Sequence, residues 1–166
     1  MTDRIHDIAS LEKRVRRLEA IESIKEVIAR YTEGADKRND PAIMGPLFAE
    51  NATWEAAGFG RYEGRETIAK SLADIAREQI VWSVHFMVLP SVSIGTDERT
   101  ASCTWYLWEL AKVSVNGAAA RDTWLAIKYT SVLIASDSGW MFESLKLNIL
   151  LNSPVGEPWP IVESHD

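Results

Sequence analysis

The stretch VWSVHFMVLPSVSI, residues 81–94, is where the chain changes from a helical to a β-like pattern. Three further β-like segments follow, at about 100–115, 122–136 and 140–152. Turn sequences separate the four segments, at 95–98, 116–117 and 137–139. Pro90 is expected to break the first segment, because proline cannot donate a hydrogen bond to a neighbouring strand. The spacing predicts a meander of long antiparallel strands.

The residues before this stretch predict three helices. Apolar side chains recur at steps of three and four, the helical period, at Leu11, Val15, Leu18, Ile21, Ile24, Ile28, Tyr31 and Ala35. Pro41 suits the first turn of a short second helix that runs to about Phe48. A strand-like run at 52–56 is followed by a third helix over 64–78. Helices followed by strands predict an α+β fold, in which a strongly curved sheet wraps around the first helix and leaves a cone-shaped cavity.

Length and composition predict one globular domain over residues 1–166, with an irregular tail at 153–166. The net charge of −6 argues against nucleic acid and anionic membranes as partners, because both attract basic proteins. A lone cysteine excludes an internal disulfide and a thiolate zinc site. We find no signal-like segment and no long apolar run, and so expect a cytoplasmic protein.

Histidine and carboxylate positions suggest where chemistry takes place. Two of the three histidines, His6 and His165, lie near the ends of the chain, so we expect no multi-histidine metal site. His85 lies on an apolar strand, either as a hydrogen-bonded core residue or as a base. Asp36 ends the first helix, where a carboxylate opposes the helix dipole. Tyr31 and Asp36 flank small side chains on the last helical turn, a pattern that suits a pocket wall but also fits a solvated aspartate.

The remaining charged residues on the strands are less informative. Lys146, Glu109 and Lys128 are each expected at the surface, although one or two of them could reach the cavity. Seven tryptophans suggest a pocket or core rich in large apolar side chains. The side chains expected to line the pocket are Trp54, Phe59, Trp82, Trp108 and Leu145.

Several short motifs resemble one known family. They are YTEGADKRND (31–40), PLFAENATW (46–54), GRYEGRETI (60–68), His85-Phe86 and Trp140 after Asp137-Ser138-Gly139. In order and spacing, over about residues 10–152, they resemble the SnoaL-like branch of the nuclear-transport-factor-2-like superfamily. Its enzymes include dehydrochlorinases and dehydratases that use a His–Asp dyad and no cofactor.

The resemblance implies roles for particular residues. His85 would remove a carbon-bound proton, Asp36 would orient its ring, and Tyr31 would donate a hydrogen bond to the substrate. Relatives often carry an arginine on the last strand that assists the leaving group; here Lys146 would stand in for it, or Leu145 would face the pocket instead. Relatives also carry an asparagine four residues after the histidine, where this chain has Leu89.

The resemblance favours a lyase that eliminates water or halide from a small hydrophobic cyclic substrate. One alternative is an isomerase or cyclase in which Asp36 is the base and Tyr31 the oxyanion donor. Another is a non-catalytic ligand-binding or assembly subunit similar to the small subunit of ring-hydroxylating dioxygenases. A homo-oligomer is expected, with a trimer favoured and a dimer as the second choice.

Overall fold

Three α-helices and six strands make up the computed structural model, which describes residues 2–114 and 117–159. The helical elements are α1 (Thr2–Asp36), α2 (Pro41–Met44), the 3-10 turn η1 (Gly45–Leu47) and α3 (Arg65–Glu78). The strands are β1 (Phe48–Ala56), β2 (Gly60–Glu63), β3 (Ile80–Ile94), β4 (Thr100–Val113), β5 (Arg121–Ser136) and β6 (Gly139–Pro154). The predicted α+β fold is confirmed. The turn expected at 116–117 and the end of its preceding segment fall partly outside the described residues.

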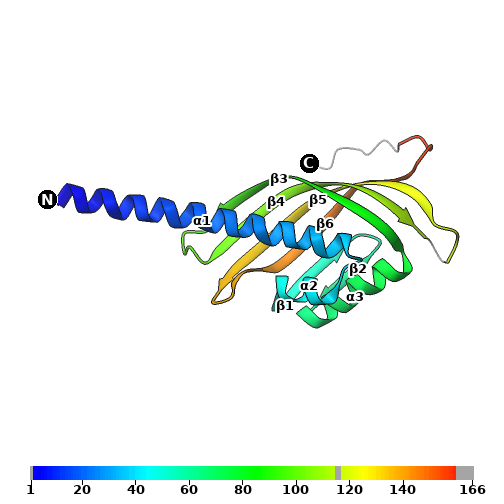
Figure 1. Ribbon diagram of the computed structural model, residues 1–166, viewed down its shortest axis with the longest axis horizontal. Coiled ribbons are helices and arrows are strands. Elements are labelled where there is room, and N and C mark those ends of the chain that lie inside the picture. Colours follow the sequence, from blue (N-terminus) through cyan, green and yellow to red (C-terminus); the bar gives the residue numbers. More distant parts are fainter. Residues whose placement is uncertain (1, 115–116, 160–166) are drawn as a thin grey trace.

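The strands form one curved sheet in the order β2-β1-β6-β5-β4-β3. All neighbours are antiparallel except β1 and β6, which run parallel. Figure 1 shows α1 lying along the concave side of the sheet, with α2 and α3 beside its C-terminal end. The core fills this concave space, because inward-facing strand residues alternate with exposed ones.

Only the second half of α1 is packed against the sheet. Ile24, Ile28 and Tyr31 are buried in the core, which explains the apolar spacing of this part of the helix. The first half continues beyond the sheet, as Figure 1 shows, and its apolar side chains are exposed. The helix therefore begins well before Leu11, the first apolar position of the predicted pattern.

The turn between α1 and α2 is held against the rest of the domain. Arg38 and Asn39 adopt left-handed backbone conformations that end the helix. The Arg38 guanidinium donates to the carbonyls of Val81 (2.7 Å) and Ala76 (3.1 Å). The Asn39 side chain donates to the carbonyl of Leu72 at 2.9 Å. These bonds tie the end of α1 to α3 and to the start of β3.

Pro90 does not break β3, and that prediction was wrong. The strand continues through it with a bulge, where the pairing with β4 shifts between Val88 and Ser91. Leu89 has a left-handed backbone with a φ of 44°, which is unfavourable for leucine, and its side chain is exposed. The backbone strain of the bulge therefore lies at the surface and not in the core. A bulge keeps the strand paired on both sides of a residue that cannot donate.

The irregular tail begins after Pro154 and not at Ser153. Ser153 and Pro154 still pair with Trp124 and Thr123 of β5, and Ser153 is buried. The tail then returns over the sheet, where Trp159 packs edge-on against Trp108 with ring centroids 6.1 Å apart. Residues 160–166 lie outside the described part of the chain. Within the described part, no helix combines the length and the apolar character needed to cross a membrane.

Candidate active site

His85 and Asp36 meet at the end of α1. Asp36 Oδ1 lies 2.8 Å from His85 Nδ1 and also accepts from the backbone N–H of His85 at 3.0 Å. Because the carboxylate can only accept, Nδ1 is the nitrogen that carries the proton. In the neutral ring, Nε2 is then free to accept a proton.

Glu109 lies on the other side of the imidazole. It is the residue directly opposite His85 in the β3–β4 pairing, so both side chains point to the same face of the sheet. Glu109 Oε1 is 3.6 Å from His85 Nε2 and has no hydrogen-bond partner, although Glu109 is only 2% exposed. Burial raises the pKa of the Glu109 carboxyl, and the charge of Asp36 adds to the rise while that of His85 opposes it. The site therefore favours a neutral, protonated Glu109.

Two tyrosines complete the polar part of the site. The Tyr31 hydroxyl accepts a hydrogen bond from the Trp54 indole at 3.2 Å, so its own proton remains for another acceptor. Tyr129 packs edge-on against Tyr31, with ring centroids 6.2 Å apart. Burial raises the pKa of both phenols, which keeps them neutral donors.

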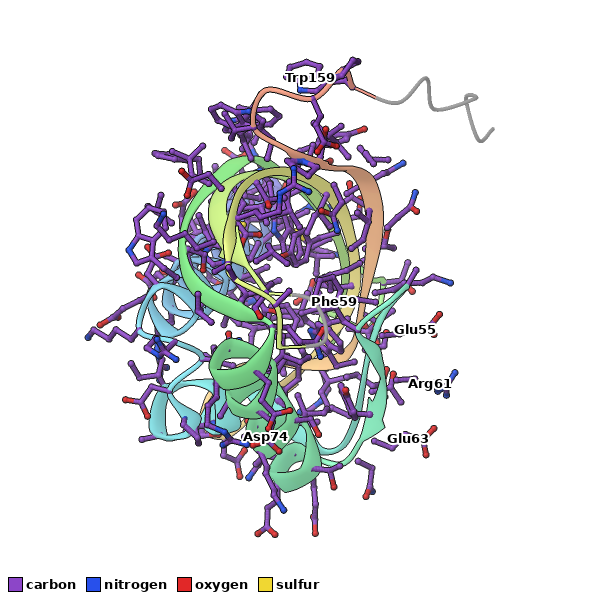
Figure 2. The ribbon with its side chains drawn as sticks, turned by 90° about the vertical axis from the view of Figure 1, so that its right-hand side faces the viewer. Glu55, Phe59, Arg61, Glu63, Asp74 and Trp159 are labelled. Carbon is purple, nitrogen blue, oxygen red and sulfur yellow. The ribbon has the colours of Figure 1, made fainter. Side chains whose placement is uncertain are left out.

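These groups open into one small cavity of about 50 Å³. His85, Glu109, Tyr31, Tyr129 and Asn39 supply its polar atoms. The other lining residues are apolar: Ala35, Trp54, Phe59, Leu72, Ile75, Ile80, Leu125, Ile127, Leu147 and Ile149. Figure 2 looks into the curved sheet from one end and shows Phe59 there, while Glu55, Arg61 and Glu63 lie on the outer side. A cavity with these walls suits an apolar molecule that carries a few polar atoms.

The structure brings together some of the expected site residues. His85, Tyr31, Trp54 and Phe59 all line the cavity, and Asp36 reaches it through His85.

Four other expected site residues lie elsewhere. Lys146 is on the outer face of β6, 66% exposed and 3.4 Å from Glu55. Leu145 faces inward but is buried in the core, and Leu147 takes its expected place at the cavity. Trp108 lies on the outer face of the sheet and stacks on Trp124 with ring centroids 5.3 Å apart.

Trp82 is also on the outer face, half exposed, beside a separate small cleft that it shares with Asp36 and Arg38. The indole therefore approaches the site from outside and does not line the main cavity. Among the described residues, no three or more His, Cys, Asp or Glu side chains gather in a way that could hold a metal ion.

Glu109 is the main residue that the sequence analysis did not place. A glutamate on a strand is most often exposed, so the residue type alone did not predict a buried side chain at the cavity. One signal was available in the alternation of Glu109 with Trp105, Leu107 and Cys103, since an acidic residue on an otherwise apolar face is unusual.

A curved sheet closed around a helix, with a histidine and a carboxylate at its cavity, defines a protein of the nuclear-transport-factor-2-like class. A family model for the SnoaL-like domain matches residues 16–146, and the chain belongs to that family. No protein of curated function matches the chain.

Solved structures with the same fold are distant in sequence. A hexachlorocyclohexane dehydrochlorinase (LinA) type 2 is 20% identical, with a TM-score of 0.77 over 86% of this chain and 93% of its own. The LinA-type3 enzyme from Novosphingobium barchaimii LL02 is 18% identical, with a TM-score of 0.76 over 90% and 99%. A proposed scytalone dehydratase from Novosphingobium aromaticivorans DSM 12444 is 17% identical, with a TM-score of 0.73 over 92% and 99%. At these identities the likeness is one of fold.

Proposed function

We propose that this protein is a cofactor-independent lyase that eliminates water from a small, hydrophobic cyclic substrate. The observation that carries the proposal is the placement of His85 between two carboxyl groups with different surroundings. Asp36 holds Nδ1, so Nε2 is the basic nitrogen. Glu109 faces Nε2 across a gap of 3.6 Å, and burial raises the pKa of its carboxyl, which favours the neutral form. A base and an acid at one cavity are what an elimination requires.

Glu109 favours water over halide as the leaving group. Hydroxide is a poor leaving group and must be protonated as the C–O bond breaks, whereas chloride leaves unaided. A protonated carboxylic acid at the cavity wall supplies that proton. In the proposed reaction, His85 Nε2 first takes a proton from carbon, and the electron pair left behind then forms the double bond as the hydroxyl leaves as water with the proton of Glu109. Transfer of a proton from His85 to Glu109 through solvent then restores the site.

The cavity also limits the substrate. Imidazole is a moderate base, so the proton it removes must be acidified by a neighbouring carbonyl group. The Tyr31 hydroxyl can donate to that carbonyl oxygen and stabilise the enolate that forms. With apolar walls around these groups, the best candidates are small cyclic ketones that carry a hydroxyl on the β carbon.

The proposal is tested with three sets of matched compounds: cyclic β-hydroxy ketones, their β-chloro analogues and β,γ-unsaturated ketones. Products are identified by mass spectrometry, and His85→Ala protein measures the background. We expect the hydroxy ketones to lose one water in a His85-dependent reaction. Conversion of the chloro compounds alone, or of none of the three sets, would contradict the proposal.

An isomerase is the second candidate, favoured by the same buried carboxyl. A neutral Glu109 can donate a hydrogen bond to an enolate, as a protonated aspartate does in ketosteroid isomerase. His85 would then return the proton to a different carbon. The base expected from sequence for this reaction was Asp36, but its Oδ1 is occupied by two N–H groups of His85. Conversion of the unsaturated ketones without a change of mass would identify this activity.

A non-catalytic subunit is less well supported. That alternative predicted no His–Asp contact and a cavity closed by side chains, whereas Asp36 and His85 are in contact beside an open cavity. The oligomeric state, the cytoplasmic location and the absence of nucleic-acid partners stay predictions.

A further inference from the structure

The first half of α1 carries an apolar stripe that its own domain does not cover. Ile8, Leu11, Val15 and Leu18 are between 48% and 62% exposed. At 100° per residue, their mean direction is about 160° around the helix from the face that Ile24 and its neighbours bury in the core. The stripe is therefore turned away from the rest of the molecule.

Contacts on the opposite side hold the helix in this orientation. Lys13 and Arg16 both lie 3.7 Å from the Glu98 carboxylate in the turn between β3 and β4. The polar side of the helix thus faces its own domain, while the apolar side faces outward. In Figure 1 this part of α1 projects beyond the sheet, so the stripe is open to another molecule.

The spacing of the stripe is that of a coiled coil. Steps of three, four and three residues place Ile8 and Val15 at a positions and Leu11 and Leu18 at d positions of two heptads over 7–20. β-branched residues at a combined with leucine at d favour two parallel strands over three or four.

The flanking charges agree with a parallel pair. Arg14 at position g of one copy would face Glu19 at position e of the other, twice in a symmetric dimer. Asp7 would face Glu12 and adds no attraction. An antiparallel pair would instead bring e positions together, and both of these are glutamate. The Arg14–Glu19 pairs are therefore consistent with the parallel arrangement.

We infer that residues 7–20 form a parallel two-stranded coiled coil with a second copy of this chain. The two domains would lie at the same end of the coil, with both cavities unobstructed by it. The inference does not depend on the proposed reaction, and it adds a specific contact to the oligomer expected from sequence.

Disulfide trapping in the full-length chain tests the register. In a parallel pair the two Val15 residues face each other within reach of a disulfide, so Val15→Cys protein should form a covalent dimer on mild oxidation. Arg17→Cys, on the outer side of the coil, should not. The native Cys103 is a suitable background because it is buried, and burial raises the pKa of its thiol to about 11. No Val15→Cys dimer, or one formed only with Leu11→Cys protein, would overturn the parallel pair.

Light scattering tests the number of strands. The double variant Leu11→Ser/Leu18→Ser should have half the particle mass of the wild type, because the coil is the contact that joins the two halves of the particle. Asp7→Lys should strengthen association, because it adds an attractive pair with Glu12 of the second copy. An unchanged mass in the double variant, or a fall to one third, would overturn the inference. Circular dichroism should show that these exposed substitutions leave the fold intact.

Discussion

His85 is useful to the proposed reaction because its two ring nitrogens are placed in different surroundings. Asp36 fixes the ring from the side of Nδ1 through two contacts to one oxygen. Nε2 is left facing the cavity and Glu109. The pair thus orients a base without placing a charged group against the substrate.

His85→Ala should abolish turnover, with a loss of about 10²–10⁴-fold in kcat, the usual contribution of a general base. Lys146→Ala is the matched control, because Lys146 is exposed and paired with Glu55 outside the cavity. It should leave kcat/KM within about twofold, although the family resemblance implied a catalytic role for it. Steady-state kinetics on an identified substrate, with thermal unfolding to verify the fold, decide the comparison. Full activity in the His85 variant would exclude it as the base.

Glu109→Gln should alter how stability depends on pH. Burial raises the pKa of the Glu109 carboxyl above its ordinary value of 4.5, so the folded state holds this proton more tightly than the unfolded state. The stabilisation is therefore complete below about pH 4.5 and is lost as pH rises through the folded-state pKa. Glutamine cannot ionise, so the variant should gain stability relative to the wild type as pH rises from 5 to 8. Parallel stability curves from denaturant titration at each pH would contradict the assignment.

At the scale of elements, the bulge at Leu89 and Pro90 determines which way His85 points. On the C-terminal side of the bulge, the inward face of β3 carries Val92 and Ile94. On the N-terminal side, the inward face carries His85 and Met87. A continuous strand with the register of Ile94 and Ala101 would turn His85 outward, because a one-residue shift exchanges the two faces.

Deletion of Leu89 should therefore keep His85 facing the cavity and retain activity, because it removes the extra residue of the bulge and lets β3 pair with β4 in one continuous register. Leu89→Asn is the matched substitution. Asparagine tolerates the left-handed backbone at this site better than leucine, and the side chain is 85% exposed. It should raise the free energy of unfolding by about 0.5–1 kcal/mol and leave activity unchanged. Loss of activity in Leu89→Asn would show that this position acts through the pocket and not through the backbone.

The same feature explains what could be predicted from sequence. The three helices, β1 and the four long strands follow from local periodicity and turn residues, and their order was correct, whereas the short strand β2 was not predicted. The contact between His85 and Asp36 was expected from the family motifs. The orientation of side chains across the sheet could not be derived, because bulges in β3 and in the β5–β6 pairing each shift the register by one residue. Glu109, Leu145 and Lys146 were misplaced or left open for that reason.

At the scale of the whole molecule, the α+β domain and the exposed part of α1 are separable. The described core begins at Ile24, and residues 8–18 contact the domain mainly through the exposed pairs with Glu98. Such pairs contribute about 0–1 kcal/mol each.

A chain that starts at Ala20 should therefore fold. Its unfolding temperature should be similar to that of the Leu11→Ser/Leu18→Ser protein, which keeps the whole helix but lacks the proposed coil. It should also retain activity per site. Calorimetry and kinetics on the shortened chain measure both quantities. A failure to fold would show that the projecting half of α1 belongs to the domain.

The central claim is that Asp36 holds the proton on Nδ1 of His85 and leaves Nε2 free to act as a base. Nitrogen-15 NMR of the histidine rings reads this directly, and the His85→Ala spectrum identifies the signal. The account predicts a neutral ring at pH 7.5 with a protonated Nδ1 and an unprotonated Nε2, and a loss of this preference in Asp36→Asn. Protonation of both nitrogens, or of Nε2 alone, would contradict the account.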